Sequence, residues 1–119
     1  MTQKTISRDA LHNLKEVIGG DQDDLAELIR DFVSTLPVQV DHMQTQAKSG
    51  DWTALRISAH SCKSNARDLG ALALGDLCAA FELQCKEGSP TGMDAQIVRI
   101  ATEAEAVIEA ISALDLSDV

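Results

Sequence analysis

The sequence predicts an all-α fold, an antiparallel four-helix bundle with a short additional N-terminal helix. Apolar residues recur at spacings of three and four through five segments, and no stretch alternates as a strand does. Aromatic residues are only 3% of the 119 residues, so Leu, Ile, Val and Ala must build the core. Short loops join the four long amphipathic segments, as in antiparallel bundles. We expect one domain, residues 1–119.

The first two expected helices are residues 7–18, which would cap the bundle, and residues 21–48. The first begins at a serine suited to an N-cap and ends before two glycines. Acidic residues stand at the start of the second, where the helix dipole favours them. Pro37 lies inside the second helix and removes one backbone hydrogen bond. We therefore expect a bend or break near residues 35–36.

The remaining expected helices are residues 51–69, 72–86 and 93–114. The core stripe of the third helix steps by three and four residues and consists of Trp52, Leu55, Ala59, Cys62, Ala66 and Leu69. The fourth helix turns Leu74, Cys78, Phe81 and Cys85 inward. The segment "EGSPTG", residues 87–92, is the clearest loop in the chain.

Charge and cysteine content exclude several classes of function. The formal net charge of -9 argues against binding to a nucleic-acid backbone. No stretch approaches the roughly 18 apolar residues of a membrane span, and the N-terminus has no targeting signal. Cys62, Cys78 and Cys85 are odd in number, lie at apolar positions and form no CxxC pair. They indicate buried thiols in a reducing cytoplasm rather than a zinc or disulfide site.

A second stripe of the third helix is polar. Residues three, four and seven apart share a helix face, and from Arg56 this spacing collects His60, Lys63, Ser64 and Arg67. Residues 52–67 hold three cations and no acid, although the chain has 19 acids and 10 cations. Such a local patch suits an anion, and Lys63 is one turn from His60, where it could neutralise phosphoryl oxygens.

A histidine side chain suits the role of nucleophile, because its neutral form carries a free lone pair near pH 7. The neighbours Ala59, Ser61 and Ser64 are small, which would let a large partner reach the ring. The plainer interpretation is a surface histidine on a solvated, charged face. His12 and His42 are internal controls, since both lie off their core stripes.

The segment "AHSCKSNARDLGALALGDLCAAFE", residues 59–82, resembles the signature of histidine phosphotransfer (HPt) domains, the relay modules of multistep phosphorelays. The family pattern is roughly Ala-His-x-Leu-Lys-Gly-Ser-Ser/Ala, then Leu-Gly-Ala, then Leu-x-x-Leu-Cys-x-x-Leu-Glu. The residues that match it are Ala59, His60, Lys63, Ala66, Leu69, Gly70, Ala71, Leu74, Leu77, Cys78 and Glu82. The "GDW" before the third helix and the proline inside the second are also similar to the family.

The resemblance implies a four-helix bundle whose exposed histidine relays a phosphoryl group between receiver-domain aspartates. The resemblance implies that His60 is the phosphoacceptor and that Lys63 stabilises the phosphoryl group. Ser64, Arg67 and Arg56 would then surround the phosphoryl group. The domain would bind no ATP, have no autokinase activity and carry no cofactor or metal. The receiver would supply Mg²⁺ and an acidic pocket.

The expected partners are the receiver domains of a hybrid histidine kinase and of a response regulator. The chain starts at Met and ends soon after its last helix, from which we expect a free-standing bacterial protein, cytoplasmic and monomeric. The docking surface should surround His60 and include Ile57, Ser61 and Ser64, with a contribution from the first or second helix. We expect the interface to be modest in area and short-lived.

Two positions depart from the family pattern. Ser64 replaces the glycine that usually follows the lysine, and Cys62 replaces a leucine on the core stripe. Both are small residues and leave the nucleophile in place, so they bear on transfer rate and partner preference rather than on the reaction itself.

Three alternatives remain open. The phosphoacceptor and dimerisation domain of a histidine kinase would carry an acid directly after the histidine and a proline about five residues later, whereas here Ser61 follows and the next proline is Pro90. A non-catalytic module could use the same surface to sequester a receiver without carrying phosphate. A purely structural bundle is the third alternative.

Overall fold

The computed structural model describes residues 5–88 and 92–119, which are almost entirely helical. In these ranges the helices are α1 (Arg8–Val17), α2 (Gln22–Ser49), α3 (Trp52–Asp68), α4 (Leu72–Glu87), α5 (Met93–Ser112) and the short 3-10 helix η1 (Leu116–Asp118). No strand occurs within the described ranges. None of the helices found there is long and apolar enough to cross a membrane.

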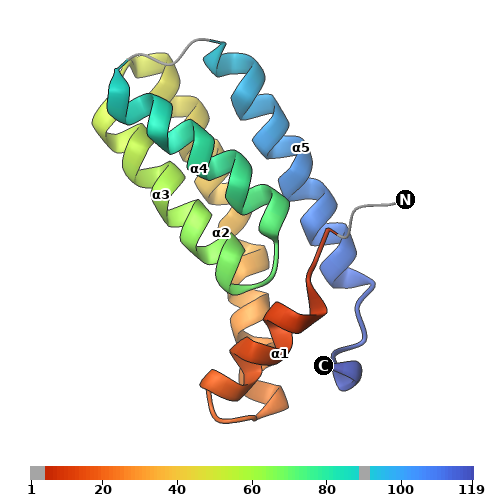
Figure 1. Cartoon of the computed structure of the whole chain (residues 1–119). Helices are drawn as coiled ribbons and strands as arrows, with labels where there is room; N and C mark the ends of the chain where they lie inside the picture. The colour runs from red at the N-terminus through yellow and green to blue at the C-terminus, as the bar shows by residue number, and fades with distance from the viewer. Residues whose placement is uncertain (1–4, 89–91) are drawn as a thin grey trace.

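Helices α2 to α5 form an antiparallel bundle, as Figure 1 shows. Helix α3 packs between α2 and α4, and α5 closes the bundle against α4 and α2. Helix α1 lies at one end, against α2 and α3. The elongated molecule measures 43 × 31 × 20 Å. The predicted fold, a four-helix bundle with a short N-terminal helix, is confirmed.

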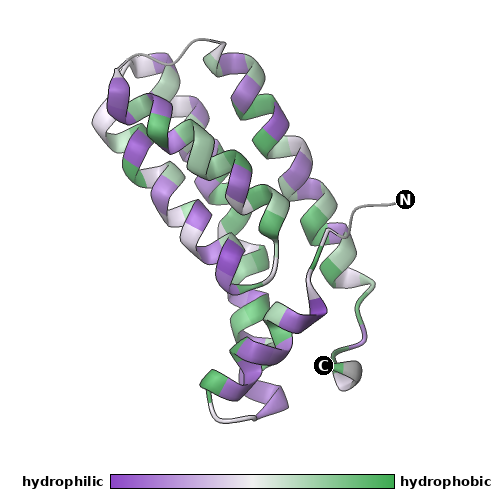
Figure 2. Ribbon diagram, in the orientation of Figure 1, coloured by the Kyte–Doolittle hydropathy of each residue, from purple (hydrophilic) through white to green (hydrophobic). Residues whose placement is uncertain are grey.

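The core consists of the apolar stripes that the helices turn toward one another (Figure 2). On α3 the stripe is as predicted, with Trp52 half-buried and the other members buried. On α4 the buried side chains include Leu74, Cys78, Phe81 and Cys85. Burying a side chain as large as Phe81 contributes roughly 1.5–3 kcal/mol. These stripes orient α3 and α4, and so determine which side of each helix remains available for chemistry.

Side-chain caps define where α2 and α3 begin. The Asp21 carboxylate accepts hydrogen bonds from the backbone N–H groups of Asp23 and Asp24, at 2.8 and 3.2 Å. The Asp51 carboxylate accepts one from the N–H of Ala54 at 3.1 Å. Each satisfies donors that a helix leaves unpaired in its first turn, which explains why these helices begin one residue after an aspartate.

Helix α2 passes through Pro37 without interruption. Of the bend or break expected near residues 35–36, the break does not occur, because α2 is helical through both residues. A proline removes one hydrogen bond, to the carbonyl of Val33, and its ring crowds that carbonyl. Leu36 and Val40 on either side are buried in the core. Tertiary packing along 28 helical residues outweighs the loss of one backbone bond.

The last helix is shorter than predicted, because α5 ends at Ser112 and the chain then turns into η1. Leu114 and Leu116 pack against the core from this C-terminal segment, and the ammonium group of Lys15 donates a hydrogen bond to the carbonyl of Val119 at 3.1 Å. Of the predicted loop 87–92, residues 89–91 lie outside the described residues, and α4 extends one residue further than predicted, to Glu87.

The turn between α3 and α4 is attached to the start of α1. Ser7 accepts a hydrogen bond from the Ala10 N–H at 3.2 Å as the N-cap of α1, and its own N–H donates to the carbonyl of Gly70 at 2.8 Å. Gly70 has φ +84°, and a Cβ atom there would lie 2.7 Å from the Ser7 carbonyl oxygen. Only glycine fits this contact, which holds α3 and α4 in register next to α1.

Candidate functional site

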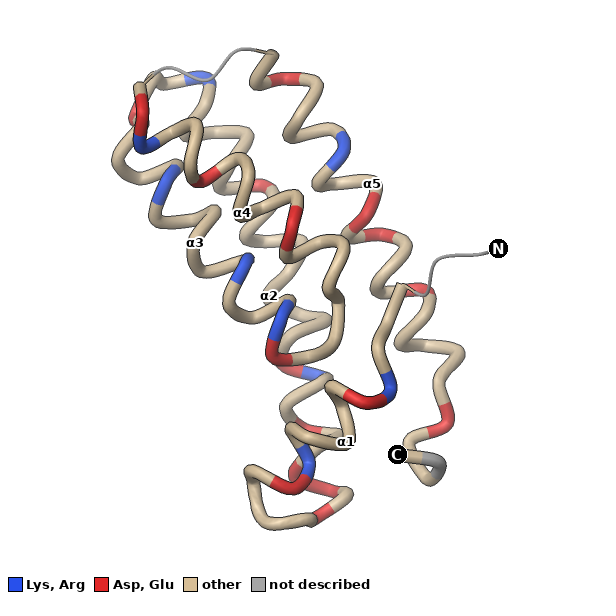
Figure 3. The backbone as a smooth tube through the Cα atoms, viewed as in Figure 1, with Lys and Arg blue, Asp and Glu red and all other residues tan. Residues whose placement is uncertain are grey.

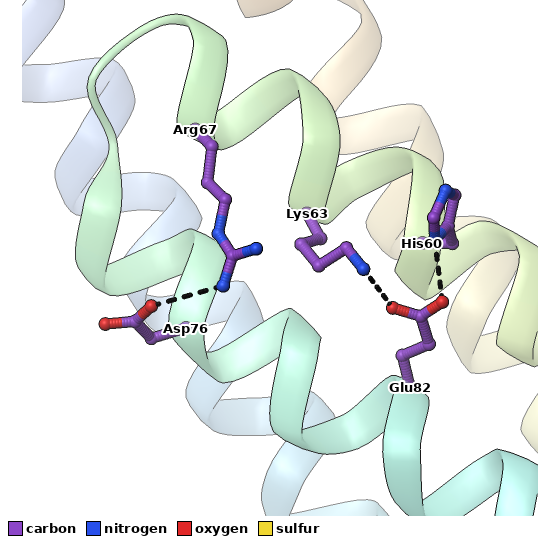
Figure 4. Close-up of polar contacts among 5 residues, drawn as sticks. All are labelled: His60, Lys63, Arg67, Asp76 and Glu82. Carbon is purple, nitrogen blue, oxygen red and sulfur yellow. Dashed lines mark hydrogen bonds and ion pairs between the residues drawn. The ribbon is translucent and has the colours of Figure 1, made fainter. Parts of the chain in front are cut away.

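His60 lies at mid-length on α3, on the side of the helix that the core does not cover. Its neighbours Ala59 and Cys62 are fully buried, whereas the imidazole is 58% exposed. The ring still has a defined orientation, because its Nδ1 atom is 2.7 Å from Oε2 of Glu82 on α4 (Figure 4). The exposed position of His60 predicted from helical spacing therefore agrees with the structure.

Glu82 also binds Lys63. The lysine Nζ donates to Glu82 Oε1 at 2.6 Å, so one carboxylate joins both side chains (Figure 4). Lys63 and Glu82 are only 20% and 17% exposed. Although helical spacing places Lys63 on the polar stripe of α3, its ammonium group turns toward α4 rather than into open solvent. The hydrogen bond from Lys63, and to a smaller extent the one from His60, holds the pKa of Glu82 below its ordinary value. The carboxylate therefore stays ionised at neutral pH.

The contact with Glu82 determines how the imidazole can react. An ionised carboxylate accepts hydrogen bonds and cannot donate one, so the hydrogen in the contact belongs to Nδ1. In the neutral ring the lone pair is then on Nε2, the nitrogen remote from Glu82. The arrangement is a nucleophile with a fixed tautomer and a counter-ion behind it.

Glu82 is the functional residue that the analysis of helical spacing missed. It is 22 residues from His60 in the chain, so no rule based on one helix face could join the two. The available signal was its match to the last position of the HPt pattern. Antiparallel packing of α3 and α4 brings the two residues together.

The cationic patch of α3 is less isolated than the sequence suggests. Figure 3 shows acidic residues of α4 alongside the basic residues of α3. Besides Glu82, Asp76 on α4 pairs with Arg67, with 3.5 Å between Nη2 and Oδ1. Residues 52–67 contain no acid in sequence, but the adjacent helix supplies two carboxylates to the same face.

The other predicted site residues surround His60 without touching it in the contacts described. Ser64 and Ser61 are half-buried, as is Arg56, and Ile57 is exposed. The Ser64 hydroxyl makes no hydrogen bond within the part of the chain that the structure describes, so it does not hold the imidazole in this state. The structure thus brings His60 and Lys63 together through Glu82, while Arg67 binds separately to Asp76.

Two buried thiols lie directly behind this face. Cys62 on α3 and Cys78 on α4 are both fully buried and contact each other. The Cys78 thiol donates a hydrogen bond to Cys62, and this bond together with burial raises the pKa of Cys78, whereas accepting the same bond lowers the pKa of Cys62. Burial likewise raises the pKa of Cys85. Protonated, buried thiols are poor nucleophiles, so Cys78 and Cys85 serve as packing.

The other two histidines lack such surroundings. His12 is exposed and pairs with Glu16 one turn later on the same helix, at 3.2 Å. His42 is exposed on α2. Neither is joined to a lysine through a shared carboxylate in the contacts of the described residues, which distinguishes both of them from His60.

A groove of about 290 Å³ runs beside α3 at the α1 end of the bundle. Its lining includes Leu14 of α1, Leu28 and Phe32 of α2, and Asn65 and Asp68 of α3. Asn65 and Asp68 follow Ser61 at helical spacing, so the groove borders the face that carries His60.

Comparison with known proteins gives one consistent result. The family model for the Hpt domain matches residues 27–114. The fold is similar to that of the histidine-containing phosphotransfer protein B (HptB) from Pseudomonas aeruginosa PAO1, with a TM-score of 0.82 and 25% identity over 91% of each chain. It is also similar to the HPT domain from a sensor hybrid histidine kinase of Shewanella, with a TM-score of 0.77 and 19% identity over 97% of this chain and 96% of that one. No curated protein matches the sequence.

Proposed function

The chain belongs to the Hpt domain family and acts in phosphorelay histidine phosphotransfer; from that premise we propose that His60 is the residue that carries the phosphoryl group. The observation behind this assignment is the exposed imidazole whose Nδ1 is 2.7 Å from an ionised carboxylate. It leaves Nε2 accessible and nucleophilic. Among the described residues, His12 and His42 have no comparable network.

We propose that Nε2 of His60 attacks the phosphorus atom of an aspartyl phosphate on a receiver domain. The Nε2 lone pair forms the N–P bond, the P–O bond to the aspartate breaks, and the aspartate carboxylate leaves with that electron pair. Nδ1 keeps its hydrogen, so the ring becomes positively charged as the bond forms. Glu82, 2.7 Å from Nδ1, stabilises that charge. The reverse step transfers the group to a second aspartate.

Lys63 has two roles in this scheme. In the resting protein it holds Glu82 ionised through the 2.6 Å contact. Once His60 is phosphorylated, we propose that its ammonium group neutralises phosphoryl oxygens, as the family resemblance implies. For that second role Nζ has to leave Oε1 of Glu82, a rotation that the flexible four-carbon stem of lysine allows.

Receiver domains are the partners with which proteins of this family work. We propose that this chain connects the receiver of a hybrid histidine kinase with that of a response regulator, and that it does so as a cytoplasmic monomer. The free state of all three buried cysteines supports a reducing compartment. We also propose that this chain carries no cofactor, and that the Mg²⁺ needed for chemistry at the aspartate is held by the receiver.

The proposed docking surface begins at His60 and extends toward α2. Ile57 is an exposed apolar side chain one turn before His60. The side chains of Ser61 and Ser64 are small and leave room for a partner next to the imidazole ring. The groove lined by Leu14 and Leu28 continues this surface onto α1 and α2. The apolar residues in its lining, Leu14, Leu28 and Phe32, support the expected contribution of these helices to receiver binding.

The direct test is transfer from a panel of receiver domains that carry radiolabelled aspartyl phosphate. Wild-type protein should accept the label in an acid-labile, base-stable form, as expected of phosphohistidine. His60→Ala should accept none, whereas His12→Ala and His42→Ala should accept label like the wild type. Labelling of the His60→Ala variant would disprove the assignment.

The same panel separates this role from the non-catalytic alternative. A sequestering module would form a complex with a receiver, detectable by titration calorimetry, and acquire no label. A structural bundle would neither bind nor become labelled. The match to the Hpt family answers the histidine-kinase alternative, so no ATP-dependent labelling is expected.

A further inference from the structure

The side chain of Arg67 packs closely over Gly75 of α4. A Cβ atom at that position would lie 2.8 Å from Cγ, 3.4 Å from Nε and 3.6 Å from Cδ of Arg67. These are the three nearest atoms to such a Cβ. Because Cγ is near the root of the side chain, any residue other than glycine would force Arg67 into a different χ1 rotamer.

The backbone itself does not require glycine at this position. Gly75 is inside α4, and its φ lies outside the left-handed region. A glycine within a helix costs about 1 kcal/mol relative to alanine. Glycine at position 75 therefore makes room for the side chain of Arg67, although it lowers the stability of the helix.

The ion pair at the end of this side chain is weak. Arg67 and Asp76 are 3.5 Å apart, with 48% and 77% of their side-chain surfaces exposed (Figure 4). Exposed pairs of this kind contribute from nothing to about 1 kcal/mol. An incoming carboxylate that offers bidentate geometry can replace Asp76 at little cost.

Arg67 is on the same stripe as His60, but it is remote from the reacting atoms. Seven residues of helix separate them, which corresponds to about 10 Å along the axis. Half-buried Ser64 lies between them, and its small side chain projects little from the helix surface. In its position beside Asp76 the guanidinium group is placed to meet the surface of a protein docked over His60.

We propose that Arg67 is a partner-recognition residue, which its packing over Gly75 holds on the His60 face, and that it binds a carboxylate of the docked receiver domain. The inference rests on the proposed function, because it takes the receiver docked at His60 as given. Asp76 acts as a placeholder that the receiver's carboxylate displaces. Opposite charges at the rim of an interface mainly accelerate association, so Arg67 should affect the bimolecular rate of transfer.

The test compares four variants using the receiver from the panel that labels wild-type protein fastest. Arg67→Ala should reduce the bimolecular rate about fivefold at low ionic strength, and the deficit should shrink as salt screens the charge. Arg99→Ala removes an exposed cation from α5 and is the matched control, expected to stay within about twofold. Gly75→Ala keeps the charge but displaces the side chain, so it should also slow transfer. Circular dichroism checks that each variant is folded.

Asp76→Ala decides between recognition and a merely structural ion pair. If Arg67 serves the partner, removing its competitor leaves the rate unchanged or raises it. If the pair only braces α3 against α4, Asp76→Ala slows transfer as much as Arg67→Ala does, and the proposal is overturned. It is equally overturned if Arg67→Ala matches Arg99→Ala. Labelling of wild-type His60 tests the proposed function separately, so failure of one is distinguishable from failure of the other.

Discussion

Oε2 of Glu82 lies 2.7 Å from Nδ1 of His60, although 22 residues of chain separate them. The same carboxylate binds Lys63 through its other oxygen at 2.6 Å. A histidine that spacing alone would leave as an isolated surface residue is thereby oriented from behind by a charged group on the adjacent helix.

Replacing Glu82 by alanine should slow phosphotransfer while leaving the phosphorylation site in place. Without the acceptor at Nδ1, neither the tautomer nor the positive charge of the reacting ring is stabilised. A loss of about 10²-fold in the transfer rate is expected, the usual scale for one electrostatic group at a reacting centre. Rapid-quench measurement of label on His60 gives this rate.

Two further variants make the Glu82 result specific. Glu82→Gln keeps an oxygen acceptor but loses the charge, so its rate should lie between those of wild type and Glu82→Ala. Glu105→Ala removes an exposed acid from α5 and should transfer at the wild-type rate. A Glu82→Ala protein as fast as Glu105→Ala would contradict the role assigned to the carboxylate.

Glu82 should also make stability depend on pH. Its folded-state pKa lies below the ordinary value of 4.5 because Lys63 and His60 bind the carboxylate. At pH values between the folded-state pKa and the unfolded-state pKa, the unfolded chain therefore binds more protons than the folded chain does. The contribution is fully present above pH 4.5 and is lost as the pH falls through the folded-state pKa. Denaturant titrations at a series of pH values measure it.

The informative quantity is the difference in unfolding free energy between wild type and Glu82→Gln. Asp115 also has a lowered pKa, because Ser117 donates hydrogen bonds to it, so the wild-type curve alone is not specific to Glu82. The difference should shrink as the solution is acidified below pH 4.5. A difference that stays constant down to pH 2 would show that the pKa of Glu82 is not lowered by folding.

Lys63→Met should raise the pKa of Glu82 and slow transfer without unfolding the protein. Methionine keeps most of the stem that packs between α3 and α4 but removes the charge. The expected cost in stability is about 1 kcal/mol, because the ion pair is only partly exposed. Carboxyl chemical shifts followed by NMR report the pKa directly. An unchanged Glu82 titration would mean that Lys63 does not hold the carboxylate ionised.

Gly70→Ala should destabilise the protein more than Gly50→Ala. Both glycines have positive φ, so both variants incur roughly 1 kcal/mol of backbone strain. At Gly50 a Cβ atom meets no atom of the other described residues within 4 Å, whereas at Gly70 it lies 2.7 Å from the carbonyl oxygen of Ser7. The Gly70 variant should therefore lose roughly 1–3 kcal/mol more, as measured by thermal or denaturant unfolding. Equal losses would mean that α1 is not anchored at this turn.

Local patterns in the sequence were sufficient to predict the helices and the bundle. The spacing of apolar residues is a property of each helix alone, so it located the core stripes and the outward position of His60 correctly. Capping residues defined the helix starts for the same reason. The bend or break expected near Pro37 did not interrupt the helix, because the packing of the whole of α2 outweighs one lost hydrogen bond.

The chemistry at His60 depended on contacts between helices, which no local pattern encodes. The position of Glu82 beside His60, the turn of Lys63 away from solvent and the packing of Arg67 over Gly75 all arise where α3 packs against α4. Helical periodicity specifies which face of a helix is polar. Only the antiparallel register of two packed helices specifies which carboxylate meets that face, and the sequence by itself left that register open.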